Sequence, residues 1–116
     1  MNLPKRLVQL DVDSTFIEQE AIELLAAKAG VLDEVATITE AAMKGELDFA
    51  QSLIARVKLL EGLSADSIEQ VRKEIRLTDG AAELVDLLHQ KGHYVSLVSG
   101  GFTNILAPIV DELKID

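Results

Sequence analysis

The chain has 116 residues, of which 48% are hydrophobic and only 3% aromatic, and its formal net charge is −9. This length suits one domain or slightly less, and the composition can fill a core of aliphatic side chains. The acidic excess argues against a nucleic-acid or anionic-membrane partner, because such surfaces require a basic field. A phosphate ligand would need backbone N–H groups, a basic side chain or a metal ion to bind here.

The sequence contains no cysteine, which excludes disulfides, thiolate catalysis and cysteine-based metal sites. The hydrophobic run at 7–10 is too short for the core of a signal peptide, and no segment is long enough to span a bilayer. We therefore expect a cytoplasmic protein without a membrane partner.

The predicted elements begin with a strand and continue into a long helical region. The strand, 7–10, is nearly continuous in hydrophobic residues, which predicts a parallel strand buried on both faces. Helices are expected over about 17–29 and 32–44, then from a capping box at Asp48 and Gln51 to about Gly62, and then from Ser64. A fifth helix, 81–91, precedes a second strand, 94–98, and a last helix, about 103–114, which Pro108 should kink unless its regular part begins there.

This order favours an α/β fold with an inserted helical subdomain. The fifth helix would be the crossover of a right-handed β-α-β unit with parallel strands. We expect an incomplete Rossmann-like core, residues 1–15 and 77–116, and a four-helix insertion, residues 16–76. The insertion leaves the first strand at its carboxyl end, which is where open α/β sheets bind ligands.

Two carboxylates, Asp11 and Asp13, follow the first strand. One interpretation is an acidic turn before a helix, with Thr15 and Glu18 as a capping box. The alternative is a catalytic pair in which one acid is a nucleophile and the other moves a proton. Two neighbouring carboxylates would also attract a divalent cation.

Ser99, Gly100 and Gly101 follow the second strand in the same way. They are either a plain turn or a nest of N–H groups for phosphate oxygens. If the strands are parallel neighbours, the acids and the nest share one crevice, as phosphoryl transfer through an aspartate requires.

The remaining charged candidates are less specific. Arg56 borders an apolar stripe of its helix, so its guanidinium either extends to solvent or holds a carboxylate. The stripe is formed by Phe49, Leu53, Val57 and Leu60. Glu20 is a first-turn helix acid by pattern. His89 and His93 flank Gly92, which breaks the helix, and we interpret them as surface or strand-start residues rather than metal ligands.

The stretches "LDVDST" and "VSGGF" and the segment "EAAMKGELDFAQSLIARVKLLEGL" resemble the phosphoserine phosphatases of the haloacid dehalogenase (HAD) superfamily. The resemblance implies a HAD-like core with a helical cap, and hydrolysis of O-phospho-L-serine to L-serine in the last step of serine biosynthesis. By the same resemblance, Asp11 is the nucleophile, Asp13 is the general acid and base, and both hold Mg²⁺. Ser99 and Gly100 match the phosphate-binding residues.

The resemblance also implies how the substrate is recognised. Glu20 would meet its ammonium group and Arg56 its carboxylate, while Met43 and Phe49 line the cap side of the pocket. A zwitterionic head group needs one such anion and one bidentate cation.

Two downstream motifs of the family, a phosphate-neutralising lysine and a Gly-Asp-Gly-x-Asn-Asp segment, do not occur in these 116 residues. We therefore expect poor hydrolysis by this chain alone. Two alternatives stay open. The chain could be a catalytically silent binding module that self-associates through an exposed sheet edge. It could also be a sister phosphatase for another small phosphomonoester.

Overall fold

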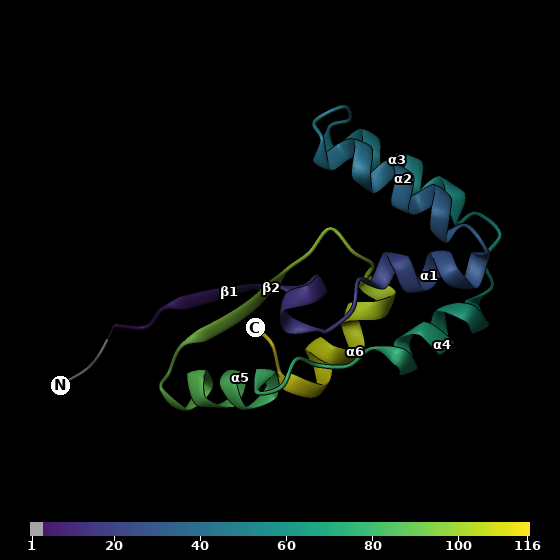
Figure 1. Ribbon diagram of the computed structural model, residues 1–116. Coiled ribbons are helices and arrows are strands. Elements are labelled where there is room, and N and C mark those ends of the chain that lie inside the picture. The colour runs from purple at the N-terminus through teal and green to yellow at the C-terminus, as the bar shows by residue number, and fades with distance from the viewer. Residues whose placement is uncertain (1–3) are drawn as a thin grey trace. The chain divides into compact units, whose positions relative to one another are not determined.

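The computed structural model describes residues 4–116 (Figure 1). It divides into two compact units, one formed by the chain up to Glu20 together with Glu74–Asp116, the other by Ala21–Lys73. The sequence placed this division at 15/16 and 76/77. Within the described part of the chain, no helix is long and hydrophobic enough to cross a membrane.

The first unit contains a parallel two-stranded sheet, as predicted. Strand β1 (Leu7–Asp11) pairs with β2 (Tyr94–Val98) in a register that runs from Leu7 opposite Tyr94 to Asp11 opposite Val98. Helix α5 (Ala81–Gln90) leads into β2, and α6 (Thr103–Leu113) follows it. The α/β fold class is therefore confirmed, and the carboxyl ends of both strands meet at one edge of the sheet.

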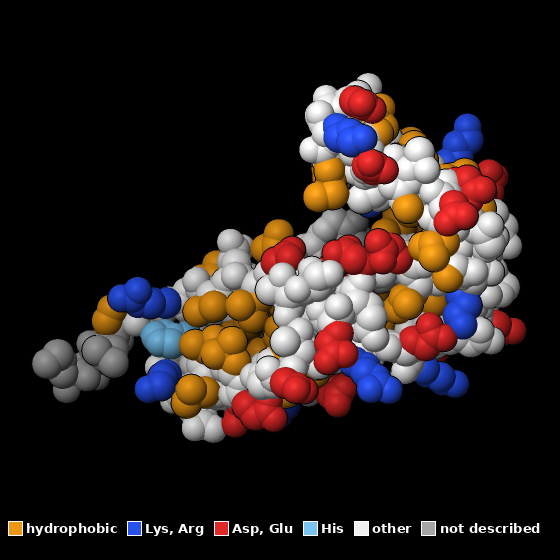
Figure 2. Space-filling model, in the orientation of Figure 1, with side chains coloured by type: hydrophobic (Ala, Val, Ile, Leu, Met, Phe, Trp, Pro, Cys, Tyr) orange, Lys and Arg blue, Asp and Glu red, His pale blue; other side chains and the backbone are white. Residues whose placement is uncertain are grey.

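Helices α5 and α6 pack on the same side of this sheet (Figure 1). Val85 of α5 and Val95 of β2 are buried in the core with Val12 and Ile17. The opposite face is exposed, because successive strand residues point to alternate sides. There Leu7 is 58%, Tyr94 48% and Val98 53% exposed, and hydrophobic side chains are visible at the surface around the strands (Figure 2). The prediction that the first strand is buried on both faces is wrong for the residues described.

A wide turn, Val12–Phe16 (η1), follows β1, and residues 17–20 after it are not helical, although the sequence predicted a helix from Ile17. Helix α1 begins only at Ala21, because the chain before it is extended and pairs with the segment that returns to the core. Ile17 forms an antiparallel bridge with Leu77. The amide of Glu18 donates to the carbonyl of Arg76 at 2.9 Å, so these residues cannot be helical.

The second unit consists of helices, as expected. They are α1 (Ala21–Ala29), α2 (Leu32–Met43), α3 (Phe49–Leu59) and α4 (Ala65–Glu74), whose last residue belongs to the first unit. The predicted capping box is present at the start of α3, where Asp48 and Gln51 each accept a hydrogen bond from the other's backbone N–H. Ser64 accepts from the amide of Ser67 at 3.2 Å and thereby caps α4.

The end of the chain returns to the free edge of β2. Helix α6 begins at Thr103 and contains Pro108, so its regular part does not start at the proline. Lys114, with φ 56°, ends the helix in the left-handed region. The amide of Asp116 then donates to the carbonyl of Val95 at 2.8 Å.

Candidate active site

Asp11 and Ser99 lie at the same edge of the sheet. Asp11 is the last residue of β1 and pairs with Val98, which is the last residue of β2, and Ser99 comes next in the chain. Both strands are parallel, so both side chains emerge where a ligand of an open α/β sheet binds. The predicted neighbourhood of the two motifs is therefore present.

The turn η1 carries Asp13 from the strand end toward this edge. Its two hydrophobic ends anchor it, since Val12 is fully buried and Phe16 is 3% exposed. Between them, Asp13 is extended and Ser14 is left-handed, with φ 58°. This left-handed position is uncommon for a residue other than glycine. The turn thus presents Asp13 as part of a shaped loop rather than of a helix.

Thr15 forms a hydrogen bond with Asp11 and does not cap a helix. Its Oγ1 donates to Oδ2 of Asp11 at 2.9 Å, and no helix starts at this position. The capping-box interpretation of Thr15 and Glu18 is therefore wrong. Thr78, from the returning segment, donates from Oγ1 to the carbonyl of Thr15 at 2.6 Å and holds the turn in place.

The Ser99–Gly101 loop lies close to Asp13. The amide of Gly101 donates to Oγ of Ser99 at 2.8 Å, which leaves the hydroxyl hydrogen of Ser99 free to point at an anion. A Cβ placed on Gly101 would lie 2.9 Å from Oγ of Ser99 and 3.9 Å from Oδ2 of Asp13. Gly100, between them, is exposed. The structure thus brings a carboxylate of the first motif together with the loop of the second.

Glu20 lies beyond η1 and is bonded to Ser14 of that turn. Oγ of Ser14 donates to Oε1 of Glu20 at 2.8 Å, and the amide of Ser14 donates to the carbonyl of Gln19 at 3.1 Å. Sequence reasoning missed Ser14, Thr15 and Thr78 as supporting groups. The available signal was the Ser-Thr pair directly after two acids at a strand end.

The other predicted site residues, Met43, Phe49 and Arg56, belong to the helical unit. Met43 is 85% and Phe49 65% exposed. Helix α3 instead buries Ser52, which is 1% exposed, so its packed face is displaced from the stripe that contains Phe49. A small residue on the packed face allows α2 and α3 to approach closely.

Arg56 is half-buried between α3 and α2. Its Nε donates to the carbonyl of Ser52 at 3.3 Å, and its Nη1 lies 3.5 Å from Oγ1 of Thr39. No carboxylate among residues 4–116 is paired with it. The guanidinium is therefore fixed by neutral oxygens and keeps its charge available for an anion.

The oxygen atoms at the strand ends are the type of ligand that a hard cation binds. Asp11 and Asp13 offer carboxylate and carbonyl oxygens, the ligands that Mg²⁺ prefers, and Mg²⁺ keeps several waters. In the part of the chain that the structure describes, no group of three or more acidic or histidine side chains could hold a metal ion. The two aspartates fit as part of a magnesium site.

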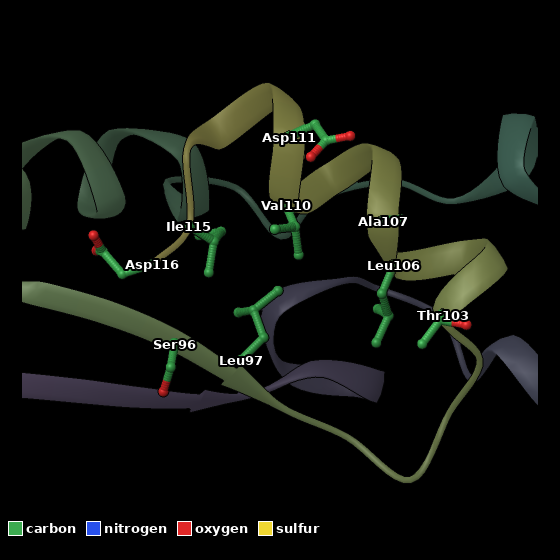
Figure 3. A pocket seen from close by; sticks show the side chains of 9 residues that line it. All are labelled: Ser96, Leu97, Thr103, Leu106, Ala107, Val110, Asp111, Ile115 and Asp116. Atoms are coloured by element: carbon green, nitrogen blue, oxygen red, sulfur yellow. The ribbon is translucent and has the colours of Figure 1, made fainter.

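A separate groove of about 440 Å³ lies between β2 and α6 (Figure 3). Leu97, Leu106, Val110 and Ile115 make it largely hydrophobic, and Asp116 closes one end. None of the predicted catalytic residues lines it. It is part of the packing between sheet and helix, away from the carboxylate edge.

The acidity of Asp116 is perturbed by two hydrogen bonds. The backbone N–H of Val95 donates to Oδ2 at 2.9 Å and, with Nε2 of His89 at 2.8 Å, holds the pKa of Asp116 below its ordinary value of 3.8. His93 accepts through Nδ1 from the amide of Arg6 at 3.1 Å. The two histidines thus have separate structural partners.

Comparisons with known proteins agree with this geometry. The family model of haloacid dehalogenase-like hydrolases matches residues 8–116. The chain is 54% identical over 112 residues to a phosphoserine phosphatase of Lactococcus lactis, covering 97% of this chain and 52% of that protein. Across eight of the curated relatives that it matches, the chain spans 27% to 55% of their length.

Solved structures give the same result. A substrate-bound phosphoserine phosphatase complex is similar with a TM-score of 0.91 and 40% identity, over 98% of this chain and 54% of that one. A phospho-aspartyl intermediate analogue of phosphoserine phosphatase gives 0.90 and 41%, over 98% and 55%. With its two aspartates and its Ser-Gly-Gly loop at one sheet edge, the chain belongs to the family of haloacid dehalogenase-like hydrolases.

Proposed function

We propose that this chain carries the nucleophile, the acid–base group and the head-group residues of a phosphoserine phosphatase, which hydrolyses O-phospho-L-serine to L-serine and phosphate. The observation that carries the proposal is the position of Asp11, Asp13 and Ser99 at one edge of the sheet. The similarity to phosphoserine phosphatases over nearly the whole chain supports it.

In the first half-reaction, Asp11 attacks the phosphorus atom through its carboxylate. The hydrogen bond from Thr15 holds Oδ2 and leaves Oδ1 to attack. The ester P–O bond breaks, and protonated Asp13 gives its proton to the serine oxygen that leaves. Ser99 donates its hydroxyl hydrogen to a phosphate oxygen, while the backbone N–H of Gly100 contributes to the same nest.

In the second half-reaction, water attacks the phosphorus of the aspartyl phosphate. Asp13, now a carboxylate, takes the proton of this water, and the P–O bond to Asp11 breaks to release phosphate. The solved phospho-aspartyl intermediate analogue of a similar phosphatase supports this route.

Asp11 and Asp13 would hold Mg²⁺, which supplies positive charge for the phosphate oxygens when it is bound. Asp11 would contribute its carboxylate and Asp13 its carbonyl. A strongly acidic chain needs this local positive charge, since its net charge of −9 otherwise repels a phosphomonoester.

Two charged side chains would bind the amino-acid part of the substrate. Glu20, oriented by Ser14, would bind the ammonium group, and the half-buried guanidinium of Arg56 would bind the carboxylate in a bidentate manner. Met43 and Phe49 supply exposed hydrophobic surface for the pocket. We place the reaction in serine biosynthesis and, as the sequence led us to expect, in the cytoplasm.

The test is release of phosphate from O-phospho-L-serine with Mg²⁺. Two proteins are compared: these 116 residues, and the same residues extended by the segment that the Lactococcus lactis relative has beyond the match. We expect release from the extended protein and far less from the 116 residues, because their described part offers too few metal ligands. In the extended protein, Asp11→Asn should abolish release, and wild-type rates in that variant would refute the nucleophile.

A second candidate function is a self-associating module without turnover. The exposed sheet face with Leu7, Tyr94 and Val98 favours it, because parallel sheets are normally covered on both faces. A sister phosphatase for another small phosphomonoester would instead release phosphate from that ester and not from phosphoserine.

A further inference from the structure

We infer that Gln19 is a positioning residue, whose side-chain carboxamide ties the chain around the Asp13 turn and Glu20 to the returning segment at Glu74–Arg76. Its role in substrate selection rests on the proposed function. Its role as a tie between two chain segments depends on the hydrogen bonds alone.

The carboxamide of Gln19 bonds to two main-chain groups that are two residues apart. Its Nε2 donates to the carbonyl of Glu74 at 2.6 Å, and its Oε1 accepts from the amide of Arg76 at 3.0 Å. In an antiparallel ladder such as that of Ile17 and Leu77, these two groups would bond to an N–H and a C=O of the facing strand. The carboxamide thus takes the place of two main-chain groups of a strand beside the returning segment.

These bonds continue a short ladder of main-chain bonds. The amide of Thr78 donates to the carbonyl of Phe16 at 2.9 Å, and the amide of Glu18 donates to the carbonyl of Arg76 at the same distance. Beyond Glu18 the main chain turns away into α1, and the side chain of Gln19 takes over the pairing. Only a residue with both a donor and an acceptor at its end can do this.

Gln19 also contacts the turn, from its main chain. Its carbonyl accepts from the amide of Ser14 at 3.1 Å, and Ser14 in turn donates from Oγ to Oε1 of Glu20. The returning segment, Gln19, Ser14 and Glu20 therefore form one connected set of hydrogen bonds. A shift of Gln19 would change the orientation of the carboxylate that we assign to the substrate ammonium.

Gln19→Leu removes both side-chain bonds and keeps a similar volume. The control is Gln70→Leu, at an exposed position of α4. Amide hydrogen exchange on the 116-residue chain should be faster at Arg76 in Gln19→Leu by about fivefold, the effect of one lost hydrogen bond. Exchange at Ser14 should rise as well, whereas Gln70→Leu should leave both amides unchanged. Unchanged exchange at Arg76 and Ser14 in Gln19→Leu would overturn the inference.

Gln19→Glu tests separately the hydrogen bond that Nε2 of Gln19 donates to the carbonyl of Glu74. A carboxylate still accepts from the amide of Arg76 but cannot donate to the carbonyl of Glu74. Its protonated form can donate, so acidification toward pH 4 should restore protection near Glu74 in this variant and not in Gln19→Leu. Failure of this rescue would contradict the strand-like role of the carboxamide.

Substrate selection is measured by NMR titration with O-phospho-L-serine and with inorganic phosphate. We expect Gln19→Leu to lower the preference for phosphoserine about fivefold and to leave phosphate binding unchanged. An unchanged preference would overturn the part of the inference that concerns Glu20. A wild-type chain that does not prefer phosphoserine would count against the proposed function, while the exchange rates still decide whether Gln19 ties the two segments.

Discussion

Oδ2 of Asp13 lies 3.9 Å from the position that a Cβ atom on Gly101 would take, although the two residues follow different strands. The same Cβ would lie 2.9 Å from Oγ of Ser99, which is closer than such atoms approach without a shift. Gly101 is therefore the point where the acidic turn and the Ser-Gly-Gly loop meet. A side chain there would move the hydroxyl of Ser99.

Gly101→Ala should weaken anion binding without unfolding the protein. The added methyl group displaces Oγ of Ser99, so one hydrogen bond to a charged phosphate is lost, which corresponds to about tenfold in the dissociation constant. Titration with inorganic phosphate and Mg²⁺ measures the effect. Gly92→Ala is not a suitable control, because Gly92 has φ 82° and an alanine there would be strained. Ala107→Gly, at an exposed position of α6, is used instead as the control for a change in stability. Unaltered phosphate affinity in Gly101→Ala would contradict the nest.

Arg56→Lys should impair phosphoserine selectively. A lysine cannot present a planar two-point fork to a carboxylate, and it also loses the bonds to Ser52 and Thr39. In the extended protein the Michaelis constant for phosphoserine should rise about tenfold or more, while a simple aryl phosphate is little affected. Arg72→Lys, in an exposed pair with Glu69, is the matched control. Equal losses on both substrates would show that Arg56 is structural.

The closure of the chain end onto β2 should depend on pH through Asp116. Its pKa is lowered in the folded state, chiefly by the N–H of Val95 and then by His89, so its contribution to stability is present above its ordinary value of 3.8. That contribution is lost as pH falls through the lowered pKa. The amide resonance of Val95 should shift in this acidic range. Asp116→Asn should abolish the shift, and a shift that persists in Asp116→Asn would exclude Asp116 as its source.

Self-association should use the uncovered face of the sheet if the chain associates at all. Tyr94→Lys places a charge on this face and should reduce the sedimentation coefficient of any dimer to that of a monomer. Leu87→Lys is matched to it, because Leu87 on α5 and Tyr94 are both 48% exposed. A wild-type chain that sediments as a monomer at high concentration would rule out the self-associating module.

Much of the local structure could be predicted from short patterns. The two strands, the capping box at Asp48 and the helix after Gly80 follow from hydrophobic periodicity and from the chemistry of neighbouring residues, which act within a few positions. The shared edge of Asp11 and Ser99 also followed, because parallel neighbours bring their carboxyl ends together.

The start of α1 and the packed face of α3 could not be predicted in this way. The backbone at Ile17 is extended because it pairs with Leu77. Leu77 is far along the sequence, and no local pattern predicts this pairing. Helix α3 packs through the face around Ser52 and leaves Phe49 of the predicted apolar stripe exposed, because the neighbouring helix determines which face of α3 is buried.

The sequence by itself determined which chemical groups this protein has at its strand ends: two aspartates, and a serine beside two glycines. Only the tertiary structure decided how these groups are held. Thr78 bonds to the carbonyl of Thr15, and Gln19 bonds to Glu74 and Arg76, so that two segments on either side of the helical insertion support one turn. The physical reason is that hydrogen bonds depend on distance and direction in space, which the fold brings about between residues remote in the chain.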